Sequence, residues 1–375
     1  MRQLLFSLLI AVGLGGNAIV REIQPLQIVE ADSIVLYDFF WCNWQREADK
    51  IAGDSVRIWP WQPQPATTDK VDRRADAWAA VAAGTDLTGE GSSPDISSTL
   101  QWLRENWELA MLTGQAKYFD MAERILANSI LSYWHNNPQS RQNATIVQLL
   151  RAIGSMAYAT RGNHIYINMY MRSNVHVKNE AVDFCMQLSN SSPWYNDTSI
   201  RIAKDMSPVE NVADTVLSEF QRLIVHEEST DTTELTFHIR IPFWASDSDA
   251  SRSVLFFVNG SIVKPDITDG YAVISGRWAV GDFINIKLPS PILRLYSDQH
   301  PQHVALQRGP LVYVSGNYAK GWTFDPDKPL GHFFNQGNEA IMLKGELENQ
   351  YGTKPFMAAP YYLFGQKEQI YIPVK

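Results

Sequence analysis

The sequence predicts an α+β protein of more than one domain, in which a helical region precedes an antiparallel β-sandwich. Three observations support this prediction. The chain has 375 residues, which is more than a single hydrophobic core usually holds. Its composition is 45% apolar and only 19% charged, which argues against a disordered protein. Near Gly162 the hydrophobic pattern changes from a helical period to strict alternation, and this change indicates that strands follow helices.

Three amphipathic helices are expected before that point. The first has an N-cap at Ser97 or Ser98 and ends at Gly114, the second occupies about 116–135, and the third about 145–160. Apolar side chains at helical spacing define the buried stripe of the third helix: Leu149, Leu150, Ile153 and Met156. A short helix is also expected at 73–83, after an irregular stretch at 59–65.

Alternation of apolar and polar residues predicts many short strands after Gly162. The strongest turn signal is Asn259-Gly260, which follows an apolar run and is typical of a tight β-hairpin. Many short strands separated by turn residues are typical of a β-sandwich. Its core is expected to contain Leu235, Phe237, Ile239, Ile241, Phe257, Ile284 and Ile286.

The first eighteen residues have the features of an export signal. Arg2 provides a positive charge, an apolar stretch at 4–14 is too short to span a bilayer, and small residues at 16–18 suit a signal peptidase. The predicted organisation is therefore a signal peptide at 1–18, a helical region at 19–161 and a sandwich at 162–375. A secreted or periplasmic protein with no membrane partner after signal removal is expected.

Cys42 and Cys185 fall in different predicted domains. A disulfide between them is one alternative, and two separate buried thiols are the preferred one.

Charge and motifs exclude several classes of function. The net charge is −8 with no Lys/Arg-rich run, so nucleic acid is not an expected partner. The sequence contains no nucleophile-elbow, phosphate-loop or metalloprotease motif, and its 8 histidines show no metal-ligand spacing. The 12 Trp, 15 Tyr and 16 Phe suit either a packed core, which is preferred, or stacking on sugar rings.

Several segments resemble glycoside hydrolase family 127, the bacterial β-L-arabinofuranosidases. The most specific is VALQRGPLVY at 304–313, and others are HIRIPFWA at 238–245, VNG at 258–260 and PYYLF at 360–364. In the helical part, ENW at 105–107 and LTG at 112–114 also follow the family pattern. The resemblance covers about 95–375 and implies that the helices are part of an (α/α)₆ barrel, with a carbohydrate as the partner.

The resemblance also implies a catalytic site, and this chain departs from it there. The family is similar to retaining glycosidases that use a zinc-bound cysteine thiolate and a separate Glu as acid/base. Carried over without gaps, the zinc-ligand Glu falls on Asp95, a zinc Cys on Ser97, and the Cys-Cys pair on Arg141 and Gln142. Glu90 is a weak candidate acid/base, for which a solvated loop carboxylate is the preferred reading. The expected catalytic residues are thus Glu90 and Asp95, and no bound zinc or other cofactor is expected.

Length adds an independent argument about the barrel. Twelve helices with their connections need roughly 190 residues, whereas 19–160 provides about 140. An incomplete barrel is therefore expected, either because the lineage lost part of the catalytic domain or because part of the coding sequence is missing.

Two functions remain open from the sequence. One is an exported glycoside hydrolase-like protein that acts on terminal arabinofuranose in plant-type glycans by a retaining mechanism. The alternative is a non-catalytic relic of the family that binds carbohydrate or a partner. The absence of the thiolate pair favours the relic, and we expect no release of arabinose.

Overall fold

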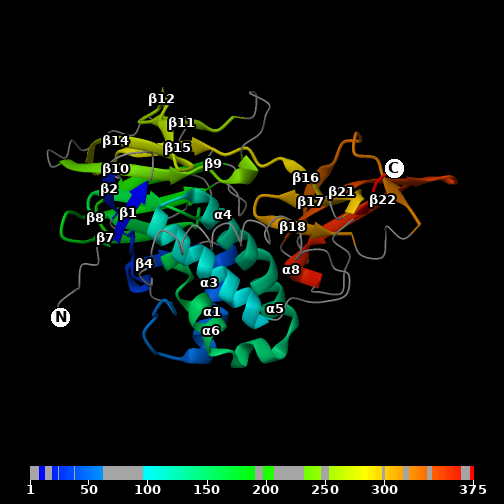
Figure 1. Cartoon of the computed structure of the whole chain (residues 1–375), viewed down its shortest axis with the longest axis horizontal. Helices are drawn as coiled ribbons and strands as arrows, with labels where there is room; N and C mark the ends of the chain where they lie inside the picture. The colour runs from blue at the N-terminus through cyan, green and yellow to red at the C-terminus, as the bar shows by residue number, and fades with distance from the viewer. Residues whose placement is uncertain are drawn as a thin grey trace. The chain divides into compact units, whose positions relative to one another are not determined.

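The computed structural model describes residues 8–12, 19–23, 25–37, 39–61, 96–190, 197–206, 232–245, 253–297, 300–315, 321–335, 340–364 and 372–375 (Figure 1). The chain divides into two compact units. The first comprises Met1–Thr68, Glu108–Phe119 and Arg141–Ser290, and the second comprises Asp69–Trp107, Asp120–Ser140 and Pro291–Lys375. Both units combine helices with large antiparallel sheets, so the α+β class is confirmed. The predicted domain boundaries stay predictions.

The first two predicted helices are present. Helix α3 spans Ile96–Thr113 and ends before Gly114, whose φ of +69° is easily adopted by glycine. Ser97 and Ser98 lie inside the first turn of α3, so the predicted N-cap is placed too late. The second predicted helix is α4, Ala116–Ile125, continued by a π-helical turn at Leu126–Ile130 and by α5, Leu131–Asn136. The helix predicted at 73–83 lies outside the described residues.

The third predicted helix ends earlier than expected. Helix α6 spans Ala144–Arg151, and a 3₁₀ turn follows at Ile153–Met156. The predicted stripe is buried as expected, since Leu149, Leu150, Ile153 and Met156 are each 0% exposed. The prediction up to residue 160 is wrong because strand β5, Tyr158–Arg161, pairs with β6, His164–Ile167, in a hairpin whose turn uses Gly162 at φ +60°.

Helix α1, Phe39–Ala52, was not expected from the sequence, and it packs against α6. A buried arginine joins the two helices. Arg151 Nε donates to Asp49 Oδ1 at 3.0 Å, and its Nη1 donates to Ser55 Oγ at 2.8 Å. Arg151 Nη2 also donates to the carbonyls of Gly53 and Ser55 after the helix end. This side chain caps α1 and has its hydrogen-bonding groups satisfied. The assignment of the helices to an incomplete (α/α)₆ barrel is not confirmed and stays a prediction.

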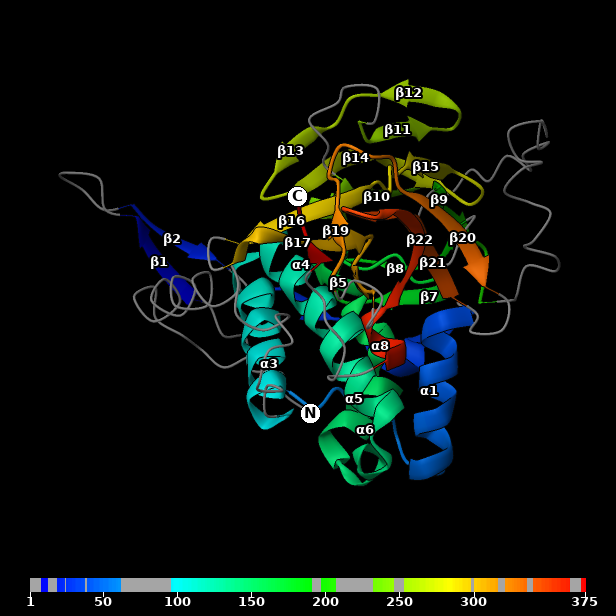
Figure 2. The same ribbon diagram turned by 90° about the vertical axis from the view of Figure 1, so that its right-hand side faces the viewer.

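Two sheets of the first unit stack as the layers of a sandwich (Figure 2). The first has the order β13-β14-β10-β6-β5-β3, and the second β12-β11-β15-β9-β8-β7-β4. All the pairs named within these sheets are antiparallel except β10 with β6, which run parallel. The remaining strands of the two sheets are β3 Gln27–Ile28, β4 Ile34–Leu36, β7 Ser173–Lys178, β8 Asp183–Asn190, β9 Asp197–Ala203, β10 Thr232–Arg240, β11 Leu255–Val258, β12 Ser261–Val263, β13 Asp266–Thr268, β14 Tyr271–Ala279 and β15 Phe283–Lys287.

The space between these layers is the core of the first unit. Leu235, Phe237, Ile239, Ile284 and Ile286 are buried there, as the alternation predicts. Two predictions for this core are wrong, because Ile241 follows the end of β10 and is only half-buried, and Phe257 is half-buried.

The register of β11 explains the error at Phe257. Phe256 lies opposite Ile286, whose side chain is buried, whereas Phe257 lies opposite Asn285. An unbroken apolar run gives no alternation from which this choice can be read. The Asn259-Gly260 turn is confirmed, with φ of 48° and 80° and Val258 paired with Ser261.

The segment at 25–37 contributes one edge strand to each layer of the sandwich. Gln27 in β3 pairs with Thr160 in β5, and Ile34 in β4 pairs with Val175 in β7. This segment was assigned to the helical region by the sequence analysis. Apolar segments this short, in which apolar and polar residues do not clearly alternate, carry too little periodicity to identify them as strands. Strands β1, Leu8–Val12, and β2, Ile19–Ile23, pair with each other in a two-stranded antiparallel sheet.

The second unit is built on an eight-stranded sheet with the path β16-β17-β18-β22-β21-β19, to which β20 and β23 are added. Helix α8, Tyr361–Phe364, contacts α5 and strand β18. The face of the sheet with Ala305, Val312 and Val314 packs against Tyr361 of α8. The strands are β16 Ile292–Ser297, β17 His300–Arg308, β18 Leu311–Val314, β19 Thr323–Phe324, β20 Gly331–Asn335, β21 Ala340–Asn349, β22 Gly352–Pro360 and β23 Ile372–Pro373.

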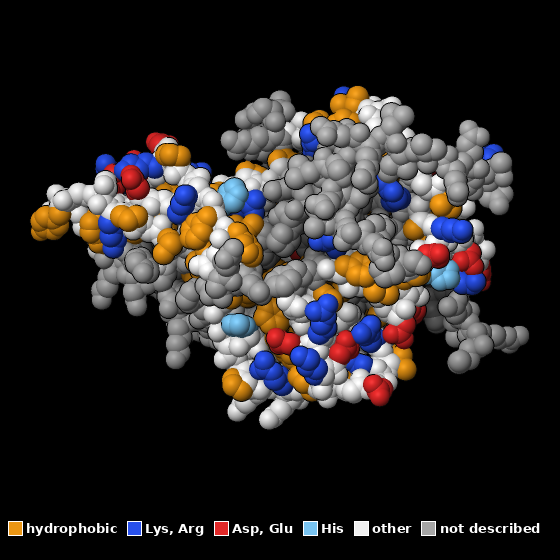
Figure 3. All heavy atoms as spheres, turned by 180° about the vertical axis from the view of Figure 1, so that it is seen from behind, with side chains coloured by type: hydrophobic (Ala, Val, Ile, Leu, Met, Phe, Trp, Pro, Cys, Tyr) orange, Lys and Arg blue, Asp and Glu red, His pale blue; other side chains and the backbone are white. Residues whose placement is uncertain are grey.

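Charges on the described surface are mixed in sign. In the face shown in Figure 3, Lys/Arg and Asp/Glu side chains alternate instead of gathering by sign, in line with the net charge of −8. None of the described helices is long and apolar enough to cross a membrane.

Candidate functional site

The catalytic residues predicted from the sequence, Glu90 and Asp95, lie outside the described residues. Ser97 is exposed in the first turn of α3. Arg141 and Gln142 end a 3₁₀ turn at Pro138–Gln142. Arg141 Nη2 lies 3.6 Å from a carboxylate oxygen of Glu47, and both side chains are largely exposed. The position where the resemblance places the nucleophile is therefore a surface ion pair.

The two cysteines do not replace the missing nucleophile pair. Neither cysteine forms a disulfide. Cys42 is buried in α1, and Cys185 is half-buried in β8, so the preferred interpretation of two separate thiols agrees with the structure except that only one is buried. Burial and the neighbouring Asp205 and Asp183 raise the pKa of Cys185, which keeps it a thiol at neutral pH.

The zinc centre implied by the resemblance does not fit the residues seen here. Ser97, Arg141 and Gln142 offer a hydroxyl, a cation and an amide, which are poor zinc ligands. Within the described ranges, no three His, Cys, Asp or Glu side chains converge on a common point.

The described residues of the first unit bring together a cluster of titratable and aromatic groups on one face of the six-stranded sheet. We call it the histidine patch, and it consists of Arg161, His164, Tyr166, His238 and Tyr271. These residues come from β5, β6, β10 and β14. Strand pairing sets Arg161 opposite His164 and His238 opposite Tyr166. The patch therefore lies on the face of the six-stranded sheet that points away from the core residues Leu235, Phe237 and Ile239.

Direct contacts hold the patch together. His164 Nδ1 and His238 Nε2 are 2.8 Å apart and share a hydrogen bond. The His238 ring stacks on Tyr166, with ring centroids 4.2 Å apart. Tyr271 stands edge-on to Tyr166 and donates its hydroxyl hydrogen to Asn168 Oδ1 at 2.8 Å. The tyrosines thus form a buried floor beneath two imidazoles.

Both imidazoles are neutral at physiological pH. Burial, followed by the charges of His164 and Arg161, lowers the pKa of His238 to about 4. Burial and Arg161 also lower the pKa of His164. A pair of neutral imidazoles linked by one hydrogen bond keeps one further ring nitrogen on each ring for other partners.

Arg161 provides the unused hydrogen-bond donors of the patch. Its guanidinium lies over the Tyr166 ring, with 5.8 Å between Cζ and the ring centroid. Its Nε and Nη2 are shielded from solvent and have no hydrogen-bond partner. A side chain added at Gly114 would come 3.7 Å from Arg161 Nη2, so the guanidinium lies at the C-terminal end of α3. The helix dipole there favours a cation.

The patch can bind hydroxyl or carbonyl oxygens, but it lacks the groups for glycoside hydrolysis. A retaining or inverting mechanism needs two carboxyl groups, or another nucleophile with an acid, around the sugar. Asp269, which raises the pKa of Tyr166, is the acid that acts on the patch among the described residues. Aromatic floors with hydrogen-bond donors at their edge are suited to sugar recognition.

The histidine patch is not evident from the sequence. His164 and His238 are 74 positions apart and have no motif spacing. One signal was present, because both sit at outward positions of predicted strands, next to the buried Ile165 and between the buried Phe237 and Ile239. The parallel pairing of β6 with β10 that brings them together could not be read from the alternation.

Part of this chain matches a known protein family. Residues 164–290 match the domain described as "Beta-L-arabinofuranosidase, GH127 middle domain". This range contains four of the five residues of the histidine patch. No match to a curated protein was found.

Solved structures share the fold at low sequence identity. A GH127 β-arabinofuranosidase is similar with a TM-score of 0.64 and 16% identity, over 93% of this chain and 61% of its own. A GH127 β-L-arabinofuranosidase from Geobacillus stearothermophilus T6 has a TM-score of 0.56 and 19% identity, over 74% of this chain and 49% of its own. A protein described as a glycoside hydrolase has a TM-score of 0.59 and 16% identity, over 78% and 59%. The chain thus spans about half to three fifths of the length of these proteins.

Proposed function

We propose that the chain is a member of the GH127 β-L-arabinofuranosidase family, to whose middle domain residues 164–290 are similar, and that it recognises terminal arabinofuranose in plant-type glycans. The observation that carries the proposal is the match of residues 164–290 to that domain. We further propose that the protein is secreted or periplasmic, which the signal-like features of residues 1–18 support.

The residues favour recognition without turnover by the family's thiolate mechanism. Arg141 and Gln142 stand where the resemblance places the nucleophilic cysteine pair, and Arg141 is engaged with Glu47. Neither side chain can attack an anomeric carbon. In this proposal the protein is therefore a sugar-binding relative of a glycosidase.

Hydrolysis by carboxylates is the second candidate function. Glu90 and Asp95 are the acids that the sequence offers for it. A retaining pair of carboxyl groups about 5 Å apart would make such a mechanism possible.

Binding and turnover are to be measured on the same preparation. We expect calorimetry to show binding of an oligosaccharide with a terminal β-L-arabinofuranosyl group, and no binding when that group is removed enzymatically. We expect an aryl β-L-arabinofuranoside to release no arabinose above the rate without protein. Release that is lost in Glu90→Gln or Asp95→Asn, and that survives a thiol-blocking reagent, would establish the second candidate instead.

The histidine patch is the surface we propose for this recognition, because its donors lack partners. Arg161→Met removes these donors and is expected to weaken sugar binding about tenfold. The matched control is Arg277→Met, an exposed cation on the same face of the same sheet. Equal affinities of the two variants would contradict this role of the patch.

A further inference from the structure

The second unit contains a buried arginine without hydrogen-bond partners for two of its nitrogens. Arg308 is 3% exposed, and its Nε and Nη1 are shielded from solvent and unpaired. Natural proteins rarely leave a buried guanidinium unpaired, because the desolvation cost is several kcal/mol. Such a group needs an explanation beyond packing.

The chain around Arg308 is held in place by neighbouring groups, so its position is built into the fold. Asn128 Nδ2 donates to the Pro310 carbonyl at 2.9 Å, and Asn128 Oδ1 accepts from the Val312 amide at 2.8 Å. Gln307 Nε2 donates to the Gly309 carbonyl at 2.8 Å. Gly309 has φ +57°, which allows the turn directly after Arg308. These contacts fix the backbone on both sides of the turn.

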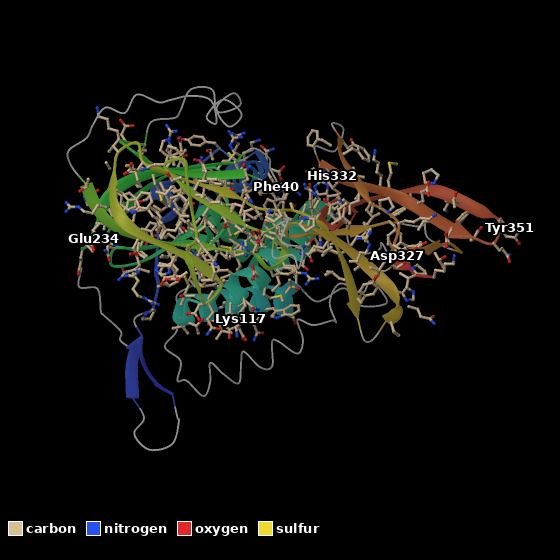
Figure 4. The ribbon with its side chains drawn as sticks, turned by 90° about the horizontal axis from the view of Figure 1, so that it is seen from above. Phe40, Lys117, Glu234, Asp327, His332 and Tyr351 are labelled. Carbon is tan, nitrogen blue, oxygen red and sulfur yellow. The ribbon has the colours of Figure 1, made fainter. Side chains whose placement is uncertain are left out.

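Strand register gives the surroundings of the Arg308 side chain. Arg308 shares a face of the sheet with Leu306, which lies opposite Tyr313. The same face continues through Ala358 and Leu343, which pair with each other, to His332 opposite Leu343. His332 is exposed, so this face reaches solvent at β20 (Figure 4).

The charged groups that act on His332 are cationic. Arg308 and Lys344, after the effect of burial, lower the pKa of His332. Burial lowers the pKa of Arg308, and Tyr313 raises it. For Arg308 and His332, no carboxylate is among the groups acting on them in the described part of the chain. The Arg308 cation beside a neutral imidazole creates a positive potential on this face, and Lys344, which lies on the other face of the sheet, adds to it.

We propose that Arg308 is the anchor of an oxyanion-binding site in the second unit, with His332 at its entrance. Guanidinium groups bind carboxylates and phosphates through paired N–H donors, and Nε with one Nη is such a pair. The oxyanion is either the carboxylate of an acidic sugar or a free small anion. The site itself does not depend on the proposed function, whereas its assignment to an acidic sugar rests on it.

The test uses the full chain at neutral pH and constant ionic strength. The probes are galacturonate, its neutral counterpart galactose, acetate, inorganic phosphate and chloride. We expect galacturonate to raise the thermal unfolding midpoint more than galactose and chloride do. A stronger effect of acetate or phosphate than of galacturonate would overturn the acidic-sugar assignment and support a site for free anions. If no anion raises the unfolding midpoint more than chloride does, the proposed site is overturned.

Variants link the effect to Arg308. Arg308→Gln is expected to weaken binding of the effective anion by at least about tenfold, and Arg308→Lys to weaken it less. Lys354→Gln removes a cation in the same unit that lies over the Trp322 ring, and it is expected to bind like the unaltered protein. An unchanged affinity in Arg308→Gln would overturn the proposal.

His332→Glu gives a test that does not require changing a buried residue. The new carboxylate is expected to occupy the positive region near Arg308, abolish the response to anions and raise the unfolding midpoint. A full anion response in folded His332→Glu protein would overturn the proposal. Arabinofuranose binding is measured separately, so a failure of the proposed function can be distinguished from a failure of the anion site.

Discussion

Two buried arginines, one in each unit, have opposite hydrogen-bonding environments. The Arg151 side chain is 2% exposed, and it meets Asp49, the Ser55 hydroxyl and two carbonyls after the end of α1. Arg308 is 3% exposed and has two unpaired nitrogens. The comparison teaches that burial alone does not make an arginine a structural element. A paired guanidinium ties elements together, while an unpaired one costs stability and keeps its donors for another molecule.

The largest effect is expected for the paired arginine. Arg151→Met removes the ion pair with Asp49 and leaves the carbonyls at the end of α1 without their donor, so it should lower the free energy of unfolding by about 3–5 kcal/mol. Urea unfolding would measure the loss. Arg277→Met, which removes an exposed arginine, is the control and should change stability little. Equal losses in the two variants would contradict the structural role of Arg151.

A smaller loss is expected when the support of Arg308 is removed. Asn128→Ala deletes two buried hydrogen bonds to the turn that follows Arg308, which should lower the free energy of unfolding by about 2–3 kcal/mol. It should also weaken the anion response, because the turn no longer fixes the guanidinium. Hydrogen exchange of the Val312 amide would report the loosened turn. Unchanged protection of that amide would show that Asn128 is not the clamp.

The histidine patch is intermediate between the environments of Arg151 and Arg308, because its arginine, Arg161, is only half-buried. The folded-state pKa of His238, about 4, lies below the ordinary value of 6.5. The unfolded chain therefore binds the extra proton first, so stability is full above pH 6.5 and falls as the pH decreases toward 4. Because the site is partly open to solvent, the loss should be about 1–2 kcal/mol. His238→Gln should flatten this part of the pH–stability curve, and an equally steep curve in the variant would assign the loss to other groups.

The smallest change in stability is expected for the unpaired arginine. Arg308→Met replaces a buried cation with an apolar side chain of similar length, and it should leave the free energy of unfolding within about 1 kcal/mol or raise it. Urea unfolding beside Arg151→Met makes the comparison direct. A loss as large as that of Arg151→Met would show that Arg308 has a structural partner.

The sequence was informative where periodicity was strong and local. The end of α3 at Gly114, the buried stripe of α6 and the Asn259-Gly260 hairpin follow from side-chain spacing and backbone preference. Phe257 was misplaced because Val254–Val258 is apolar throughout, and only the pairing of β11 with β15 decides which side chain is buried.

The candidate sites required information that a local pattern does not contain. His164 and His238 meet through the parallel pairing of β6 and β10. Arg308 belongs to the VALQRGPLVY run, but its place in the sheet depends on the pairing of β17 with β16 and β18. The predicted acids Glu90 and Asp95 lie outside the described residues and stay predictions.

The two edge strands from residues 25–37 have a consequence for the order of folding. During synthesis β3 and β4 leave the ribosome before their partners in β5 and β7, which follow about 130–140 positions later. Until β5 and β7 are synthesised, this segment has no sheet to join. The edges of β5 and β7 then stay uncovered until the segment pairs with them. Closure of the sandwich at these edges therefore depends on a long-range contact, which slows folding and leaves a period in which the edges can pair with another chain.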